Sequence, residues 1–173
     1  MNIEPVLNGI ERKIPVLITG KIGSGKTRIA ELIAAELEKR GIEVGGVISP
    51  RVIRDHKTVG YTVRDLSTGE ERPFARLEPP GVPVGRFFIS VDGLEFARTA
   101  ITRAAQSTRV VFVDEVGRLE LDDKGLADAV RKILRGKALP VLLVRDELSE
   151  KVRRTFAISR FIEIRAERGG TCA

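Results

Sequence analysis

The hydrophobic positions of this chain fall into two kinds of pattern. Short, nearly continuous apolar runs cover residues 14–18, 109–113 and 140–144. Runs of this kind are typical of strands that are buried on both faces, as in parallel sheets. Elsewhere apolar residues recur at spacings of three and four, as they do over residues 29–37, and this spacing predicts helices with one buried stripe. The alternation of such strands and helices predicts a doubly wound α/β fold.

A different pattern follows the first of these helices, which we expect to end at Gly41. Residues 44–49 and 52–53 read as strands, and apolar and polar or small residues alternate over residues 59–63. An alternation with a period of two indicates a half-buried strand. Because turn-forming residues follow at 67–70, the segment predicts an antiparallel hairpin attached to the parallel core.

The second half of the chain continues the alternation. The Pro-rich segment 78–83 must be a loop, and we expect it to be a connector rather than a cover for a bound base. Strands are predicted over residues 85–91 and 161–164. Three more helices are expected, and the residues suited to begin them are Asp92, Asp123 and the pair Ser149 and Glu150.

Length and composition fit a single globular domain. The chain has 173 residues, of which 42% are hydrophobic and 31% charged, enough for a full-sized core but not for a second catalytic domain. We expect residues 1–13 to form an N-terminal extension and residues 165–173 to form a flexible tail. The start of the chain lacks the apolar core of a signal peptide. No run approaches the roughly 18 apolar residues of a membrane span.

The rarest residues point to the compartment and exclude one kind of metal site. Cys172 is the only cysteine, so an internal disulfide is excluded and a reducing cytoplasm is the natural setting. His56 is the only histidine, which leaves no basis for a Cys/His metal site. We therefore expect a cytoplasmic protein, and we favour a monomer.

The chain is basic. It carries 30 Lys and Arg against 24 Asp and Glu, which gives a net charge of +6 and a pI of about 9.8. Such a balance suits polyanionic partners, and nucleotides are anions too. The densest clusters, residues 51–54, 131–137 and 151–154, have almost no aromatic residues among them for stacking bases. We interpret them mainly as solvated faces and keep RNA binding as an alternative.

The first apolar run leads directly into a phosphate-binding motif. Residues 20–27 read G-K-I-G-S-G-K-T, which matches G-x-x-x-x-G-K-T between a predicted strand and a predicted helix. The glycines let successive N–H groups point at a phosphate, and the start of the helix adds the positive end of its dipole. We expect Lys26 to reach the β- and γ-phosphates and Thr27 to bind magnesium.

The run over residues 109–113 ends in two carboxylates, Asp114 and Glu115. Ligands of open α/β sheets bind beyond the carboxyl ends of the strands, so this pair is expected at the same rim as the phosphate loop. Asp114 has the position of a Walker-B acid that assists magnesium binding. Glu115 is suited to orient and polarise a water for attack on the γ-phosphate, or to accept the proton of a substrate hydroxyl in a kinase.

These motifs together resemble those of a known family. The phosphate loop, the hairpin over residues 46–66, the V-G-R-F segment at 84–87 and the sequence D-E-V-G-R-L-E-L at 114–121 resemble the small nucleoside-triphosphatase family described from thermophiles. The likeness extends from about residue 14 to residue 164. Only the ending departs from the family pattern, because A-E-R-G-G follows the last strand at 166–170.

The resemblance implies slow, magnesium-dependent hydrolysis of ATP, GTP and other nucleoside triphosphates on a RecA-like P-loop fold, a three-layer α/β sandwich. It also implies that two segments contact the nucleotide. Their residues are Gly20, Lys21, Ile22, Gly23, Ser24, Gly25, Lys26 and Thr27 in the first, and Val110, Val111, Phe112, Val113, Asp114, Glu115, Val116 and Gly117 in the second.

A hydrolase of this class needs positive charge against the transition state, because three equatorial oxygens share the charge of the transferred group. Arg118 follows the acidic pair, and Arg145 ends a predicted strand. We expect Arg118, together with Lys26 and Glu115, to act in catalysis. Arg145 is the second choice for the same role.

Two other functions use the same loop. A nucleotide or small-molecule kinase needs a second substrate pocket and an Arg-rich lid, for which the hairpin at 51–54 or the loop at 79–83 could serve. A nucleotide-switched binding protein, with RNA as one candidate partner, needs only slow hydrolysis that its partner stimulates.

Overall fold

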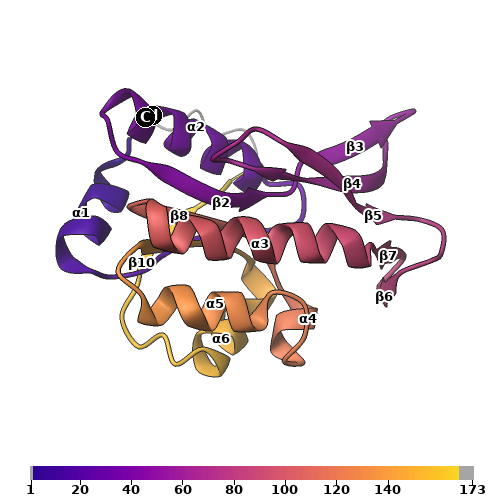
Figure 1. Ribbon diagram of the computed structural model, residues 1–173. Helices are drawn as coiled ribbons and strands as arrows, with labels where there is room; N and C mark the ends of the chain where they lie inside the picture. The colour runs from indigo at the N-terminus through magenta and orange to yellow at the C-terminus, as the bar shows by residue number, and fades with distance from the viewer. Residues whose placement is uncertain (1, 168–173) are drawn as a thin grey trace.

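The computed structural model describes residues 2–167 and contains a single mixed sheet between two layers of helices (Figure 1). The strands are β1 (Val16–Gly20), β2 (Val44–Ile48), β3 (Arg51–Arg54), β4 (Lys57–Asp65), β5 (Glu71–Arg76), β6 (Val82–Val84), β7 (Phe87–Ile89), β8 (Val110–Val116), β9 (Leu139–Arg145) and β10 (Ile162–Arg165). The helices are α1 (Glu4–Arg12), α2 (Lys26–Lys39), α3 (Val91–Ser107), α4 (Arg118–Leu121), α5 (Ala127–Arg135) and α6 (Asp146–Thr155). The α/β class predicted from the sequence is confirmed.

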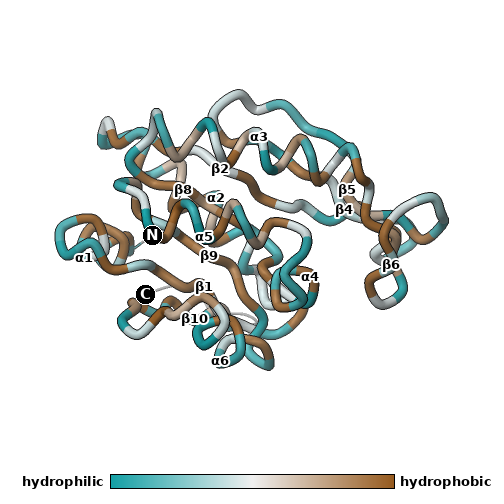
Figure 2. The backbone as a smooth tube through the Cα atoms, turned by 60° about the horizontal axis from the view of Figure 1, so that its bottom comes forward, coloured by the Kyte–Doolittle hydropathy of each residue, from teal (hydrophilic) through white to brown (hydrophobic). Residues whose placement is uncertain are grey.

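Five parallel strands form the core of the sheet, in the order β10-β1-β9-β8-β2. Every residue of β1 and β2 is buried, as are the first six residues of β9. Their near-continuous apolar sequences follow from this burial, because helices cover both faces of the sheet. Figure 2 shows the hydrophobic residues gathered on these central strands.

Beyond β2 the sheet continues as an antiparallel extension of β3 to β7, in which β4, β5, β7 and β6 lie in that order and β3 pairs with β4. It projects to the right in Figure 1. The predicted hairpin is therefore part of a larger unit. The structure extends this unit into the predicted loop, because residues 82–84 form β6. Pro83 is tolerated there since β6 is the last strand of the path, and an edge strand does not need every N–H.

Helices pack on each face of the sheet around a separate core. Helices α1 and α2 cover one face, where Val6, Ile33 and Phe112 belong to one buried apolar cluster. Helices α3, α5 and α6 cover the other, where Ile101, Ile133 and other apolar side chains pack. Residues 4–12 of the predicted N-terminal extension are thus a helix that packs on the core.

The starts of the later helices differ from the prediction. Ser90, not Asp92, is the N-cap of α3, and its hydroxyl accepts the N–H of Gly93 at 3.2 Å. Asp123 lies before α5 in a left-handed turn (φ 60°), and the short helix α4 comes before it. Helix α6 begins at Asp146, three residues before Ser149. Ser90 and Asp92 are both suitable caps that stand close together, so composition alone did not select one. The N-caps of α5 and α6 are Leu126 and Arg145, which make no side-chain capping bond, so a search for a polar cap misplaced both starts.

The end of the chain is ordered further than predicted. Arg165 belongs to β10 and pairs with Thr19, and the N–H of the buried Ala166 donates to the carbonyl of Thr19 at 2.7 Å. The rest of the predicted flexible tail, residues 168–173 with Cys172, lies outside the described residues. Within residues 2–167, no helix combines the length and hydropathy needed to cross a bilayer.

Candidate active site

The phosphate-binding motif has the predicted strand, loop and helix arrangement. Strand β1 ends at Gly20 and α2 begins at Lys26. Gly23 and Gly25 adopt φ values of 79° and 94°, a region that suits glycine, so the loop can curl with its N–H groups inward. The N-terminus of α2 closes the loop and directs the positive end of its dipole at the enclosed space.

Lys26 lies across this loop. Its side chain is buried, and Nζ donates to the carbonyls of Gly20 at 2.8 Å and Lys21 at 3.0 Å. Burial lowers the pKa of Lys26, while the nearby carboxylates of Glu115 and Asp114 oppose this shift. The ammonium group is therefore held at the centre of the loop by two backbone carbonyls, both of which a phosphate oxygen could replace as its partner.

Asp114 links the phosphate loop to β8. Its Oδ2 accepts the hydroxyl of Thr27 at 2.8 Å and the N–H of Ser49 at 2.9 Å, and its Oδ1 accepts the N–H of Glu115 at 2.8 Å. Burial, together with the charge of Glu115, raises the pKa of Asp114 to about 7. The structure thus brings together the two side chains that the sequence assigned to magnesium. Among residues 2–167, no cluster of three or more His, Cys, Asp and Glu could hold a metal without help from a substrate.

Glu115 stands on a strained bulge at the end of β8. Its φ is 57°, and β8 places two residues, Asp114 and Glu115, opposite one on β9 between the pairs Val113–Leu142 and Val116–Val144. Bulges and left-handed non-glycine residues redirect side chains and occur next to active sites. The bulge lets Asp114 point into the protein and Glu115 line the cleft beside the phosphate loop.

The two candidate arginines are placed differently. Arg145, at the end of β9, pairs with Glu115, with 3.3 Å between Nη2 and Oε2. Both side chains are about one-third exposed. Arg118 is the first residue of α4 and lines a neighbouring cavity that Glu115 also borders. The sequence ranked Arg118 first, but Arg145 contacts the acidic pair.

Other predicted nucleotide contacts lie below the surface of the site. Val110, Val111, Phe112 and Val113 have no exposed surface and form the buried part of the strand that carries Asp114. Val116 is 1% exposed and also belongs to the core. These side chains position the acidic pair and present no surface on which a nucleotide could lie.

Glu120 is a buried carboxylate to which the sequence analysis assigned no role. Its two oxygens accept the N–H groups of Gly117 at 2.8 Å and Leu126 at 2.9 Å. Burial raises its pKa in spite of these donors. Glu120 therefore fixes the segment that follows the acidic pair. The only signal in the sequence was its place, three residues after Gly117, where acids often cap a short helix.

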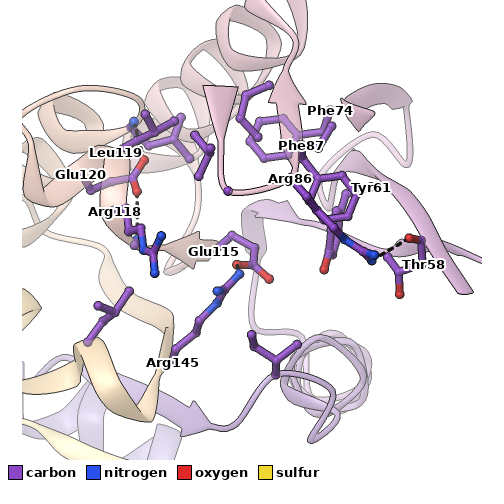
Figure 3. Close-up of a pocket in the computed structure, with 18 residues that line it drawn as sticks. Thr58, Tyr61, Phe74, Arg86, Phe87, Glu115, Arg118, Leu119, Glu120 and Arg145 are labelled. Atoms are coloured by element: carbon purple, nitrogen blue, oxygen red, sulfur yellow. Dashed lines mark hydrogen bonds and ion pairs between the residues drawn. The ribbon is translucent and has the colours of Figure 1, made fainter. Parts of the chain in front are cut away.

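Two hollows meet at Glu115. The phosphate cleft, of about 520 Å³, is lined by the loop from Ile22 to Thr27, by Arg51 of β3, and by Tyr61, Glu115 and Arg145. The second hollow, of about 490 Å³, lies between the antiparallel extension and α4, and we call it the aromatic cavity. In Figure 3, Tyr61, Phe74 and Phe87 lie on one side of it and Arg118 and Leu119 on the other, with Glu115 and Arg145 between. Tyr61 was predicted only as a residue of a half-buried strand.

Comparisons with known proteins identify relatives of this chain. A family model described as NTPase matches residues 15–166. The nucleoside-triphosphatase THEP1 of Methanopyrus kandleri is 36% identical over 131 residues, which are 76% of this chain and 73% of that protein. The nucleoside-triphosphatase THEP1 of Thermococcus kodakarensis is 33% identical over 143 residues, 80% of this chain and 79% of that one.

Two solved structures share the fold. The human cancer-related nucleoside triphosphatase has 22% sequence identity and a TM-score of 0.69, with 88% of each chain covered. THEP1 from the hyperthermophile Aquifex aeolicus has 24% identity and a TM-score of 0.70, with 89% of this chain and 90% of that chain covered. From the family model and the sequence relatives together, it follows that this chain belongs to the NTPase family.

Proposed function

We propose that this protein hydrolyses nucleoside 5′-triphosphates, ATP and GTP among them, to the diphosphate and phosphate in a magnesium-dependent reaction. The observation that carries the proposal is the shared position of three groups. Lys26 in the phosphate loop, Asp114 bonded to Thr27, and Glu115 beside them all lie at the carboxyl ends of parallel strands. Membership of the NTPase family supports the same activity.

Binding is assigned to the loop from Gly20 to Thr27. Its N–H groups and the N-terminus of α2 attract the phosphate oxygens. When they arrive, Nζ of Lys26 exchanges a backbone carbonyl partner for a β- or γ-phosphate oxygen. The exchange is favourable because a buried cation gains an anionic partner in place of a neutral one.

The residues present fit a magnesium ion. The hydroxyl of Thr27 and Oδ2 of Asp114, which are 2.8 Å apart, are hard oxygen donors. Magnesium in such sites takes one or two carboxylates together with substrate phosphates and waters. The bound ion would neutralise charge on the phosphate oxygens. Its charge would also favour the ionised form of Asp114, whose pKa the metal-free site raises.

Glu115 is assigned the role of general base. A water between the Glu115 carboxylate and the γ-phosphate would give a proton to Oε1 or Oε2 while the water oxygen bonds to the γ-phosphorus. The bond from that phosphorus to the oxygen bridging it to the β-phosphate would break, and the nucleoside diphosphate would leave. Arg145 holds Glu115 by the 3.3 Å ion pair and brings positive charge to the cleft. Arg118 is the second candidate for that charge, since it lines the adjoining cavity.

The test is phosphate release from ATP, GTP, CTP and UTP, with magnesium and with a chelator. We expect release from several of the four with magnesium and none above background with the chelator. The Lys26→Ala variant should lose about 3 kcal/mol or more of transition-state stabilisation, more than a hundredfold in kcat/KM. Lys39→Ala is the matched control, because Lys39 is on the exposed end of α2. Equal rates with and without magnesium would refute the metal requirement.

A further inference from the structure

The aromatic cavity is a second hollow that the hydrolysis of a nucleotide does not require. Its volume of about 490 Å³ is within the range of sites for small organic molecules. One wall comes from the antiparallel extension, which supplies Tyr61, Phe74 and Phe87, and the other from the segment after β8. The parallel core could carry the phosphate loop and the acidic pair without the extension. The extension therefore builds a second space beside the phosphate cleft, to which it also contributes Arg51 and Tyr61.

The extension makes its wall of the cavity aromatic. Tyr61 and Phe87 pack edge to face, with ring centroids 5.4 Å apart and planes at 80°. The guanidinium of Arg86 lies 4.8 Å from the centre of the Phe87 ring and donates to the carbonyl of Thr58 at 2.8 Å. Packed aromatic rings offer flat, preformed surfaces against which another planar ring can lie. This wall suits an aromatic ligand.

The other end of the cavity is charged and borders the reaction. Glu115 and Arg145 line both this cavity and the phosphate cleft (Figure 3). Arg118 lines the aromatic cavity but not the phosphate cleft, and within residues 2–167 it has no ion pair. A molecule in the cavity would therefore present its nearest group to Glu115, beside the position assigned to the γ-phosphate.

A third hollow leaves room for the nucleoside part of the nucleotide outside the aromatic cavity. This third hollow, of about 380 Å³, is lined by Lys21, Ser24, Asp146 and Arg165 and lies on the β10 side of the phosphate loop. Oγ of Ser24 and Oδ1 of Asp146 are buried there with no hydrogen-bond partner in the described part of the chain. Buried polar atoms without partners mark places where a polar ligand group can bind. The aromatic cavity lies on the opposite side, toward the extension.

We propose that the aromatic cavity binds a second substrate, an aromatic compound of about nucleoside size that carries a hydroxyl group, and that the γ-phosphoryl group is transferred to this hydroxyl. The proposal rests on the nucleotide site of the proposed function. It adds an acceptor other than water.

The transfer uses the groups already present. The acceptor oxygen forms a bond to the γ-phosphorus, and the bond from that phosphorus to the oxygen bridging it to the β-phosphate breaks. The hydroxyl proton passes to the carboxylate of Glu115, and the products are a phosphate monoester and the nucleoside diphosphate. Hydrolysis is the same reaction with water in the position of the hydroxyl.

The test measures radiolabelled phosphate monoester formed from γ-labelled ATP, with magnesium, at saturating ATP. Adenosine and cytidine combine an aromatic ring with hydroxyl groups. Adenine has the ring and no hydroxyl, and ribose has hydroxyl groups and no ring. We expect labelled ester from at least one nucleoside and much less from ribose. Adenine should compete with the nucleoside without being labelled.

Two variants connect the transfer to the cavity. Phe87→Ala removes part of the aromatic wall, and we expect the ratio of transfer to hydrolysis to fall at least about tenfold. Val84→Trp, which places a large ring into the cavity from β6, should have the same effect without loss of a wall. Phe96→Ala is the matched control. Phe96 is also a partly buried ring with an arginine against it, 5.8 Å from Arg72, but it lies outside the cavity.

The outcomes separate this proposal from the proposed function. ATP hydrolysis without labelled ester from either nucleoside would overturn the second-substrate proposal and leave hydrolysis standing. Faster hydrolysis without ester would overturn it as well, and would indicate an activator in the cavity. A raised KM for ATP in Val84→Trp, with no nucleoside present, would mean that the cavity holds the base of the nucleotide itself. If wild-type protein neither hydrolyses nor transfers, the proposed function fails first.

Discussion

The parallel core and the antiparallel extension are joined by the pairing of β2 with β4 and together line the two hollows at Glu115, yet they differ in burial and in the groups they supply. Strands β1, β2, β8 and β9 of the core are almost entirely buried, whereas β3 is largely exposed and β4 is mostly half-buried. The core supplies charged and backbone groups to the site, among them Lys26, Asp114 and Arg145. The extension supplies mainly the rings of Tyr61 and Phe87, together with Arg51 at the border of the phosphate cleft.

We infer from this difference that the core handles the phosphate groups and the extension selects the second molecule. Groups that handle phosphate must be held still in a low-dielectric setting, since electrostatic stabilisation depends on preorganisation. The buried ends of β1, β8 and β9 satisfy that need. The choice of a second molecule depends instead on the shape of a surface, which an exposed extension can vary without disturbing the core. Variants that act on only one of the two parts test this difference.

The largest effect is expected for Phe112, whose ring is fully buried in β8. Phe112→Ala should lower the free energy of unfolding by about 3–5 kcal/mol, because it leaves a cavity among close-packed side chains. Phe87→Ala in the extension should cost clearly less, since that ring is only half-buried. Urea unfolding of both variants measures the contrast. Similar losses would show that the extension is as integral to stability as the core.

A smaller loss is expected for Glu120. Glu120→Gln keeps the size of the side chain but replaces one of the two oxygens that accept N–H groups, from Gly117 and Leu126. The free energy of unfolding should fall by about 1–3 kcal/mol, because one buried N–H loses its acceptor. Glu147→Gln, in the first turn of α6, is a control outside this network. No difference between the two variants would contradict the structural role of Glu120.

The two parts should also respond to pH in opposite ways. Asp114 has a pKa raised from 3.8 to about 7, so the unfolded chain ionises first and stability of the nucleotide-free protein falls between about pH 4 and pH 7. Glu71 of β5 has a pKa below 4.5, because the hydroxyl of Thr62 and the guanidinium of Arg64 bond to it. The small contribution of Glu71 to the free energy of unfolding is present at neutral pH and is lost as the pH falls below 4.5 and through the lowered pKa of Glu71.

Urea unfolding, measured from below about pH 4 up to about pH 7, tests both expected changes in the free energy of unfolding. Asp114→Asn should flatten the decline toward neutral pH, and Glu71→Gln should reduce the loss on the acid side. If the free energy of unfolding of Asp114→Asn declined toward neutral pH as steeply as that of the wild type, another titrating group would be the cause.

The sequence predicted the core better than the extension, for a physical reason. Continuous apolar runs identify strands such as β8 because burial on both faces leaves little choice of residue. The carboxyl ends of those strands then located Asp114 and Glu115. In the extension, apolar and polar residues alternate only weakly along strands of three to nine residues. Pro83 and its neighbours indicated a loop where the structure has β6. Tyr61 could not be placed in the site because its position depends on pairings across the whole extension.

Local geometry at the site was also beyond the sequence. Nothing in the run of residues 109–115 indicates the bulge that separates the directions of Asp114 and Glu115. The partners of Glu120 and Arg145 depend on contacts between segments that are distant in the chain. The motifs therefore predicted which segments come together, whereas the direction of each side chain is known only from the structure.

In the proposed reaction, Glu115 activates the attacking group while the core around it binds the nucleotide. The most direct test is the Glu115→Gln variant, measured for nucleotide affinity and for single-turnover cleavage of ATP. We predict an affinity near that of the wild type and cleavage slower by about a hundredfold or more, because glutamine keeps the shape but not the basicity. Cleavage at the wild-type rate with normal affinity would contradict the account.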